Sequence, residues 1–133
     1  ITGGLAFYNE GSQGTYCSNA LKRTFPRGMD FEIFSFDLLK DAFENAVDSS
    51  DREHVTPYIW KNKSGRVTIK DFLNTNDKSE YRITLDTEED RLLITRLISE
   101  FGADEMDCGQ MVKLLKLHPE LVAINRHIEQ KKI

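Results

Sequence analysis

The segment from Tyr81 to Gly102 constrains the fold more than any other part of the chain. Tyr81–Leu85 alternates apolar and polar side chains, which is the period of a short strand. Thr87 then stands at a helix-cap position, acidic residues fill the first turn, and Gly102 ends the apolar helical pattern. A strand that leads directly into an amphipathic helix is typical of layered α/β proteins, and it places Asp86 at the junction.

The rest of the chain also alternates between short extended runs and helical patterns. Alternating side chains predict further strands at Asp30–Phe34 and Arg66–Leu73, and a strand or turn at Tyr16–Leu21. Apolar residues at helical spacing predict helices over Phe36–Val47, from Asp51 onward, over Met106–Leu117 and over His118–Ile128. This count predicts an α/β protein in which helices cover a small sheet.

Two details of the central helices also follow from the sequence. Ser35 is a suitable N-cap for the first of these helices, and Phe36 and Phe43 are expected on its apolar face. Pro57 lies beyond the first turn of the helix that starts near Asp51, so a kink or break is predicted there.

Length and charge restrict the class of protein. The chain has 133 residues, the size of one domain, and begins with Ile1, so it is either processed or an excerpt. We expect an irregular, glycine-rich lead-in over 1–15, a domain over 16–130 and a frayed tail over 131–133. The net charge of −4 argues against broad nucleic-acid binding, and no apolar run reaches the roughly 18 residues of a membrane span.

The cysteines and the absence of a signal peptide predict the compartment. Cys17 and Cys108 lie far apart and have no C-x-x-C spacing, so neither a disulfide scaffold nor a zinc site is expected. Reduced cysteines and no visible signal peptide together predict a cytoplasmic protein.

The first candidate site is the loop and strand that contain Arg27, Asp30 and Glu32. Side chains two residues apart on a strand share a face, so the two carboxylates should project together beside Arg23 and Arg27. Such a group can hold a polar substrate, because a guanidinium binds carboxylate or phosphate with two parallel hydrogen bonds. The alternative is a solvated edge strand whose acids pair with nearby bases.

The second candidate is Asp86, at the end of the Tyr81–Leu85 strand. Ligands of open α/β sheets collect outside the carboxyl ends of strands, and a carboxylate there suits Mg²⁺ beside substrate phosphates. The alternative is that Asp86 or Thr87 only caps the helix.

The third candidate is Arg52–Trp60, which combines charged, aromatic and proline residues. His54 could carry a proton or bind a substrate, and Tyr58 and Trp60 could stack on a ring or hold a subunit contact. The alternative is an ordinary aromatic core face. The sequence contains no zinc-ligand spacing and no glycine-rich phosphate-binding motif.

Several motifs, in order, resemble the spore coat polysaccharide biosynthesis protein F family. They are Ser18–Leu21 with Arg23–Phe36, Arg52–Trp60, Leu85–Asp90 and His118–Glu129. The resemblance implies a three-layer α/β/α nucleotide-diphospho-sugar transferase fold. It also implies cytidylyl transfer from CTP to a sugar in surface or spore coat polysaccharide synthesis, with Asp86 as a ligand of Mg²⁺. The same resemblance assigns Arg27, Asp30 and Glu32 to substrate binding.

The chain departs from the family at its beginning. The family starts with an arginine- and glycine-rich segment of the pattern Q-A-R-x-x-S-x-R-L-P-x-K that binds the CTP phosphates, and 1–15 does not resemble it. The expectation is therefore a fragment that lacks the N-terminal nucleotide-binding half. It would act with that half or as a homodimer. Two alternatives are a non-catalytic interaction module and a ligand-binding remnant of the enzyme.

Overall fold

The computed structural model describes residues 1–130, which divide into two compact units. Unit 1 comprises Ile1–Lys22 and Phe31–Leu73, and unit 2 comprises Arg23–Asp30 and the chain from Asn74 onward. Each unit has its own hydrophobic core. The tail expected to be frayed, 131–133, lies outside the described residues.

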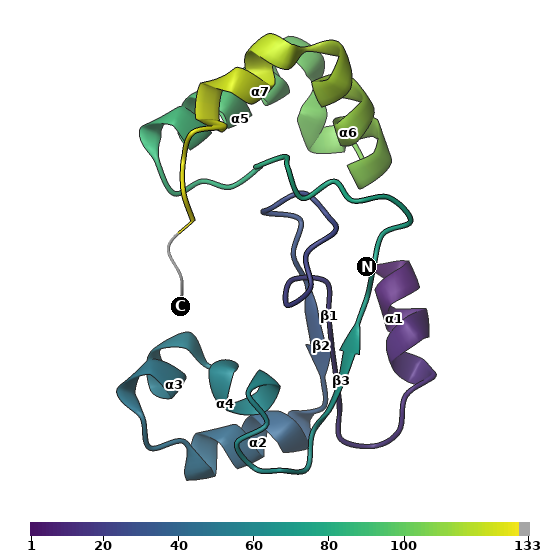
Figure 1. Cartoon of the computed structure of the whole chain (residues 1–133), viewed down its shortest axis with the longest axis vertical. Coiled ribbons are helices and arrows are strands. Elements are labelled where there is room, and N and C mark those ends of the chain that lie inside the picture. Colours follow the sequence, from purple (N-terminus) through teal and green to yellow (C-terminus); the bar gives the residue numbers. More distant parts are fainter. Residues whose placement is uncertain (131–133) are drawn as a thin grey trace. The chain divides into compact units, whose positions relative to one another are not determined.

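Unit 1 is built on a three-stranded sheet (Figure 1). The central strand is β1 (Thr15–Ser18), which pairs antiparallel with β2 (Glu32–Phe34) and parallel with β3 (Thr68–Asp71). Tyr16 lies opposite Phe34 on one side and Ile69 on the other. The predicted strands are therefore present but shorter, and Asp30 lies outside β2.

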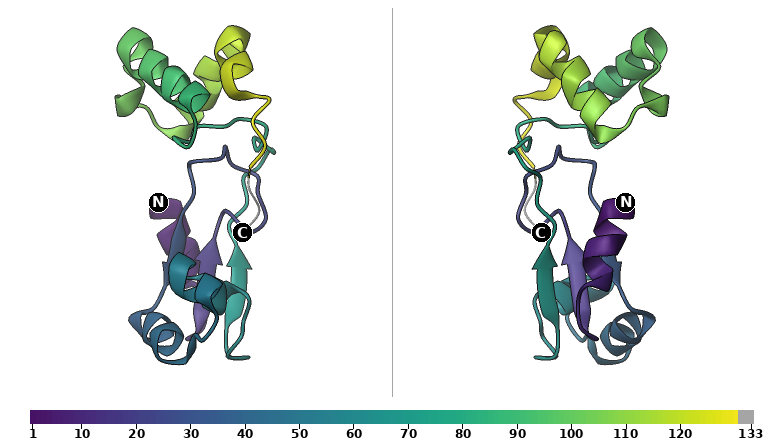
Figure 2. Two further views of the ribbon diagram at one scale, coloured as in Figure 1. Left: turned by 90° about the vertical axis from the view of Figure 1, so that its left-hand side faces the viewer. Right: turned by 90° about the vertical axis from the view of Figure 1, so that its right-hand side faces the viewer.

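Helices cover both faces of this sheet, as the two views of Figure 2 show. On the face that carries Tyr16, the side chain of Tyr16 packs with α2 (Phe36–Asn45) and α4 (Pro57–Trp60). On the opposite face, Lys70 of β3 reaches α1 (Thr2–Asn9) and donates to the carbonyl of Phe7 at 2.7 Å. Unit 1 is therefore a helix–sheet–helix arrangement.

Helix α1 corrects the prediction that 1–15 is irregular. Gly4 lets this helix approach an aromatic side chain of its own unit. A Cβ on Gly4 would lie 2.5 Å from the ring of Phe31. Close approach, rather than flexibility, therefore explains the glycine at this position.

Helix α2 begins where the sequence predicts, because the Ser35 hydroxyl accepts a hydrogen bond from the backbone N–H of Leu38. Phe36 and Phe43 share an apolar face with Ala42, as expected, but this face is only partly covered within the chain. Their side chains are 75% and 78% exposed, whereas Ala42 of the same helix is buried. The small Ala42 packs with Tyr16 of the sheet, while the rings of Phe36 and Phe43 remain exposed.

The predicted break at Pro57 is confirmed. Helix α3 (Ser49–His54) ends before the proline, and α4 begins with Pro57 at its first position. Proline suits that position because the N–H that it lacks would have no partner inside the helix.

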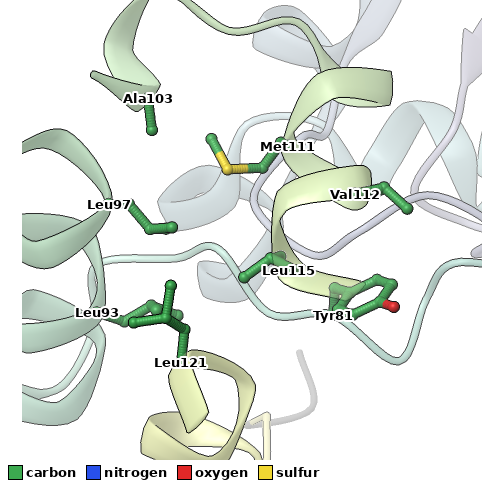
Figure 3. Packing of buried hydrophobic residues seen from close by; sticks show 8 residues of the cluster. All are labelled: Tyr81, Leu93, Leu97, Ala103, Met111, Val112, Leu115 and Leu121. Carbon is green, nitrogen blue, oxygen red and sulfur yellow. The ribbon is translucent and has the colours of Figure 1, made fainter. Parts of the chain in front are cut away.

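Unit 2 is mostly helical. It contains α5 (Glu88–Phe101), the short 3₁₀ helix η1 (Ala103–Glu105), α6 (Cys108–Leu117) and α7 (Pro119–Asn125). The side chains of the core point toward one another from these four elements and from the segment before α5 (Figure 3). They are Tyr81, Leu93, Leu97, Ala103, Met111, Val112, Leu115 and Leu121.

The ends of these helices follow the sequence signals. The Thr87 hydroxyl accepts from the backbone N–H of Asp90 at 3.2 Å, and Gly102 ends α5 in the left-handed conformation. Asp107 and Gln110 form a reciprocal capping box at the start of α6. In contrast, Tyr81–Leu85 forms no strand, and pairs only through an isolated bridge between Arg82 and Arg27.

A buried ion pair between Arg82 and Asp90 holds the segment before α5. The Asp90 carboxylate is fully buried and accepts from Nε and Nη2 of Arg82 at 2.9 and 2.8 Å. It also accepts from Thr84 Oγ1, Asn125 Nδ2 and the backbone N–H of Asp86, at 2.8, 2.8 and 3.0 Å. Five donors therefore converge on one carboxylate, one from α7 and four from the segment between residues 82 and 86.

These contacts determine the charge state of Asp90. Burial alone would raise the pKa of this carboxyl, but the hydrogen bonds from Arg82, Asn125, Asp86 and Thr84 outweigh it and hold the pKa well below its usual range. Asp90 is therefore ionised at neutral pH, and its pair with Arg82 is complete.

Both cysteines are free, as predicted; Cys17 is buried and Cys108 is half-buried. Among the described residues, no helix has the length and apolar character needed to cross a membrane.

We predict that Asp90→Asn lowers the free energy of unfolding by about 3–5 kcal/mol at pH 7, because it leaves Arg82 buried without its counter-charge. The native pKa of Asp90 is depressed, so its stabilisation is present above about pH 4 and is lost as the pH falls below that value. The variant should therefore lose less stability between pH 4 and pH 2 than the wild type. Urea unfolding at several pH values measures both effects.

The matched control is Glu100→Gln, which removes an exposed ion pair with Arg96 on the same helix. This change should cost less than about 1 kcal/mol. Equal losses for the two variants would contradict a special role for the buried pair.

Candidate functional site

Asp86 lies in unit 2, directly before the cap of α5. Its side chain is 58% exposed, and Oδ2 lies 3.3 Å from Nη2 of Arg82. Its backbone N–H is bound to the buried Asp90 carboxylate. Because Thr87 caps the helix, the side chain of Asp86 is not needed for capping and faces solvent from a fixed backbone.

Arg82 links Asp86 to the interior of unit 2. Its side chain is 7% exposed, and besides Asp90 and Asp86 its guanidinium donates to the side chain of Gln130 at 2.6 Å. Hydrogen bonding to Asp90 is the largest cause that raises the pKa of Arg82. The sequence analysis missed Arg82 and Asp90 as a pair. The only local signal was their spacing on either side of the predicted strand-to-helix junction.

The loop over residues 23–30 lies against the segment that leads to Asp86. The N–H of Arg27 donates to the carbonyl of Tyr81 at 2.9 Å, and its carbonyl accepts from the N–H of Ile83 at 2.7 Å. Gly28 has a φ of +95°, and a Cβ at this position would lie 1.8 Å from the carbonyl oxygen of Ile83. Only glycine allows this approach, which brings Arg27 and the Asp86 segment side by side.

The Arg27 side chain is half-buried and, within residues 1–130, has no hydrogen bond or ion pair of its own. Asp30, its nearest candidate partner in sequence, is bound by Arg23 at 2.9 Å. Burial, followed by the positive charge of Arg23, lowers the pKa of Arg27, and Asp30 only partly offsets this. A guanidinium in these surroundings favours an anionic ligand, such as a carboxylate or phosphate.

Glu32 belongs to a different unit from Arg27 and Asp30. It is the first residue of β2 in unit 1, whereas Asp30 precedes the strand and belongs to unit 2, so the strand predicted over Asp30–Phe34 begins only at Glu32. The exposed carboxylate of Glu32 accepts from the hydroxyl of Thr56 at 3.3 Å. This hydrogen bond connects the first candidate site, which contains Glu32, with the third, Arg52–Trp60, within unit 1.

The aromatic residues of Arg52–Trp60 have a packing role. Tyr58 and Trp60 are half-buried against the core cluster of unit 1, and Lys61 lies 5.1 Å above the Trp60 ring. His54 is exposed at the end of α3. The core interpretation therefore accounts for the two rings.

An apolar groove of about 460 Å³ lies between α2 and α3 of unit 1. Its lining combines apolar side chains of α2 with Val55 and the buried Asp51. The exposed rings of Phe36 and Phe43 contribute to it, together with the buried Ala42 and Ala46 of the same helix.

Few of the described side chains are placed to coordinate a metal ion together. Within residues 1–130, no three His, Cys, Asp or Glu side chains form a group that could hold a metal ion. Asp90 already accepts five hydrogen bonds, which leaves Asp86 as the exposed carboxylate at the predicted junction. Asp86 suits one position of Mg²⁺, provided that phosphates or other groups supply the remaining ligands.

No protein-family model matches the chain. It is 30% identical over 120 residues to the spore coat polysaccharide biosynthesis protein SpsF of Bacillus subtilis, which covers 86% of this chain and 47% of that protein. It is 33% identical over 105 residues to an uncharacterized protein of Methanocaldococcus jannaschii, which covers 78% of this chain and 43% of that protein.

A solved structure is also similar. The cytidylyltransferase from Leptospira borgpetersenii serovar Hardjo-bovis matches with a TM-score of 0.78 and 30% identity, over 96% of this chain and 52% of that chain. The present chain therefore spans about half the length of the relatives it matches. From sequence and structure together, this chain is a cytidylyltransferase-like relative of the spore coat polysaccharide biosynthesis protein F family, with a nucleotide-sugar transferase-like α/β fold.

Proposed function

We propose that the chain forms the substrate- and metal-side portion of a cytidylyltransferase that activates a sugar for polysaccharide synthesis. The observation that carries this proposal is the pairing of the Arg27 loop with the segment that presents Asp86. An anion-binding guanidinium and an exposed carboxylate are thereby presented from adjacent segments of unit 2. The similarity to SpsF and to the Leptospira cytidylyltransferase supports the same class of reaction.

In this reaction, a sugar hydroxyl loses its proton and its oxygen forms a bond to the α-phosphorus of CTP. The bond between that phosphorus and the bridging oxygen breaks, and pyrophosphate leaves with the electron pair. Mg²⁺, when bound, offsets the negative charge of the phosphates. Asp86 would provide one of its ligands, and Arg27 would bind a carboxylate or phosphate of the reactants.

The hydrogen bonds around the buried Asp90 and Arg82 fix the position of Asp86. Asp86 is flanked by a backbone hydrogen bond to Asp90 and a side-chain contact with Arg82, so its carboxylate is held before any ligand arrives. Ligands held in place in advance lose less conformational freedom on binding. In the proposed enzyme, Asp90 and Arg82 are therefore positioning residues.

We predict that Asp86→Asn removes metal binding at the start of α5. Mn²⁺, a paramagnetic substitute for Mg²⁺, should broaden the backbone NMR signals of residues 85–88 in the wild-type chain when CTP is present. The variant should need at least ten times more Mn²⁺ for the same broadening, because an amide is a poorer ligand than a carboxylate. This measurement does not require catalytic turnover.

Asp104→Asn is the matched control, since it removes an exposed carboxylate of unit 2 in η1. Its Mn²⁺ titration should follow that of the wild type. If Asp86→Asn and the wild type broaden equally, Asp86 is not a metal ligand.

The groove between α2 and α3 favours a second candidate function, a self-association module. Phe43 is 78% exposed and Phe36 is 75% exposed, and both line the groove. Large apolar side chains that gather on one exposed surface mark interaction sites. A second copy of the chain is the partner proposed for this surface.

We predict that the chain dimerises and that Phe43→Asp shifts the equilibrium at least tenfold toward monomer, because a carboxylate would then be buried in the apolar contact. Size-exclusion chromatography with light scattering measures the mass at several concentrations. Leu117→Asp, which changes a 77% exposed leucine of α6, should leave the dimer intact. A wild-type monomer at every concentration would end this second proposal.

A further inference from the structure

Asp51 lines the groove between α2 and α3 and has one carboxylate oxygen without a hydrogen-bond donor. Its side chain is 2% exposed, and its neighbours in the groove are mostly apolar. Oδ2 pairs with the ammonium of Lys63, but the buried Oδ1 has no hydrogen-bond partner within the described residues. A buried acceptor without a donor is costly and needs an explanation. The groove therefore lacks a donor as well as apolar contents.

The basic side chains of the groove do not supply this donor within one copy of the chain. Arg52 directly follows Asp51 on α3, where neighbouring side chains do not face each other, and its Nε donates to the carbonyl of Ala46 at 3.1 Å. Lys40 of α2 also lines the groove, and its ammonium lies 3.8 Å from Oε1 of Glu44. Both side chains of that pair are more than half exposed, so the pair is weak and Lys40 can take another acceptor.

The exposed face of α2 supplies what the groove lacks. Phe36, Lys40 and Phe43 follow one another at spacings of four and three residues, so they lie on the same face of this helix. This face carries two exposed rings with a cation between them. A helix of this kind suits an apolar groove that contains one unpaired carboxylate oxygen. Unit 1 therefore carries both halves of a self-complementary contact.

We propose that two copies of the chain associate with α2 of each copy in the groove of the other, and that Lys40 of one copy donates to Oδ1 of Asp51 of the partner subunit. A two-fold axis makes this contact twice, because the same surface then meets itself. The inference deepens the second candidate function, self-association through this groove, and rests on it. The rings supply apolar contact, and the ammonium completes the buried carboxylate.

The first test reverses the charge of Lys40, whose exposed side chain is not needed for folding. Lys40→Glu should weaken the dimer by about tenfold or more, because a carboxylate then faces the carboxylate of Asp51. Analytical ultracentrifugation over a range of concentrations measures the dissociation constant. The matched control is Lys116→Glu, which makes the same change of charge at an exposed position of α6 and should dimerise as the wild type does.

A mixed dimer tests whether Lys40 and Asp51 meet across the interface. Isotopically labelled Asp51→Asn is mixed with unlabelled Lys40→Glu, and native mass spectrometry counts the three kinds of dimer. In the heterodimer, one contact joins the unchanged lysine to the unchanged aspartate, and the other joins the introduced amide to the introduced carboxylate. Both are favourable, whereas the Lys40→Glu homodimer opposes two carboxylates at each contact. The heterodimer should therefore exceed the share expected from random pairing.

The contact is overturned if Lys40→Glu dimerises as the wild type does, or if heterodimers form only at the random share. Because Asp51 is buried, urea unfolding first checks that Asp51→Asn is folded; Lys40→Glu alone still tests the contact if it is not.

These outcomes are distinguishable from failure of the second candidate function. A wild-type dimer that dissociates with Phe43→Asp but not with Lys40→Glu retains self-association through the groove and removes only the Lys40–Asp51 contact. A wild-type monomer at every concentration overturns both and leaves the groove to a partner other than a second copy.

Discussion

The Arg82–Asp90 ion pair is the interaction on which the organisation of unit 2 depends. Its carboxylate accepts hydrogen bonds from α7 and from the segment before α5, and its guanidinium reaches Asp86 and Gln130. A buried pair of this kind contributes little net stability compared with apolar residues of the same volume, but removing one member is costly. Its main effect here is therefore geometric: it fixes the chain path that leads to Asp86.

The local signals of the sequence predicted the helices well. Ser35, Thr87 and Gly102 act where their residue types indicate, and Pro57 separates two helices as expected. These predictions succeeded because a cap or a break depends on a few neighbouring residues. The free cysteines and the mixed α/β character were also predicted, since both follow from spacing and pattern along the whole chain.

The failures arose where distant residues decide the outcome. Alternation at Tyr81–Leu85 predicted a strand, but the segment is occupied by the buried Arg82 and by pairing with the Arg27 loop. Phe36, Ala42 and Phe43 share an apolar helical face as predicted, yet only Ala42 is buried against the sheet. For the candidate site, residue type predicted the exposed Asp86, whereas the partner of Glu32, Thr56, comes from the turn before α4, which no local pattern reveals.

Each unit consists of two separate chain segments, and this limits the order in which contacts can form during synthesis. The polypeptide enters unit 2 at Arg23, leaves it after Asp30 and returns only at Asn74, so unit 1 contributes a 31–73 insertion between two parts of the same unit. More than 50 residues separate Gly28 from Ile83, so the contact between them cannot form during synthesis until Ile83 has emerged from the ribosome. The pairing between the Arg27 loop and the segment that leads to Asp86 therefore requires residues that follow unit 1 in the sequence, and a polypeptide cut at Leu73 would be left without it.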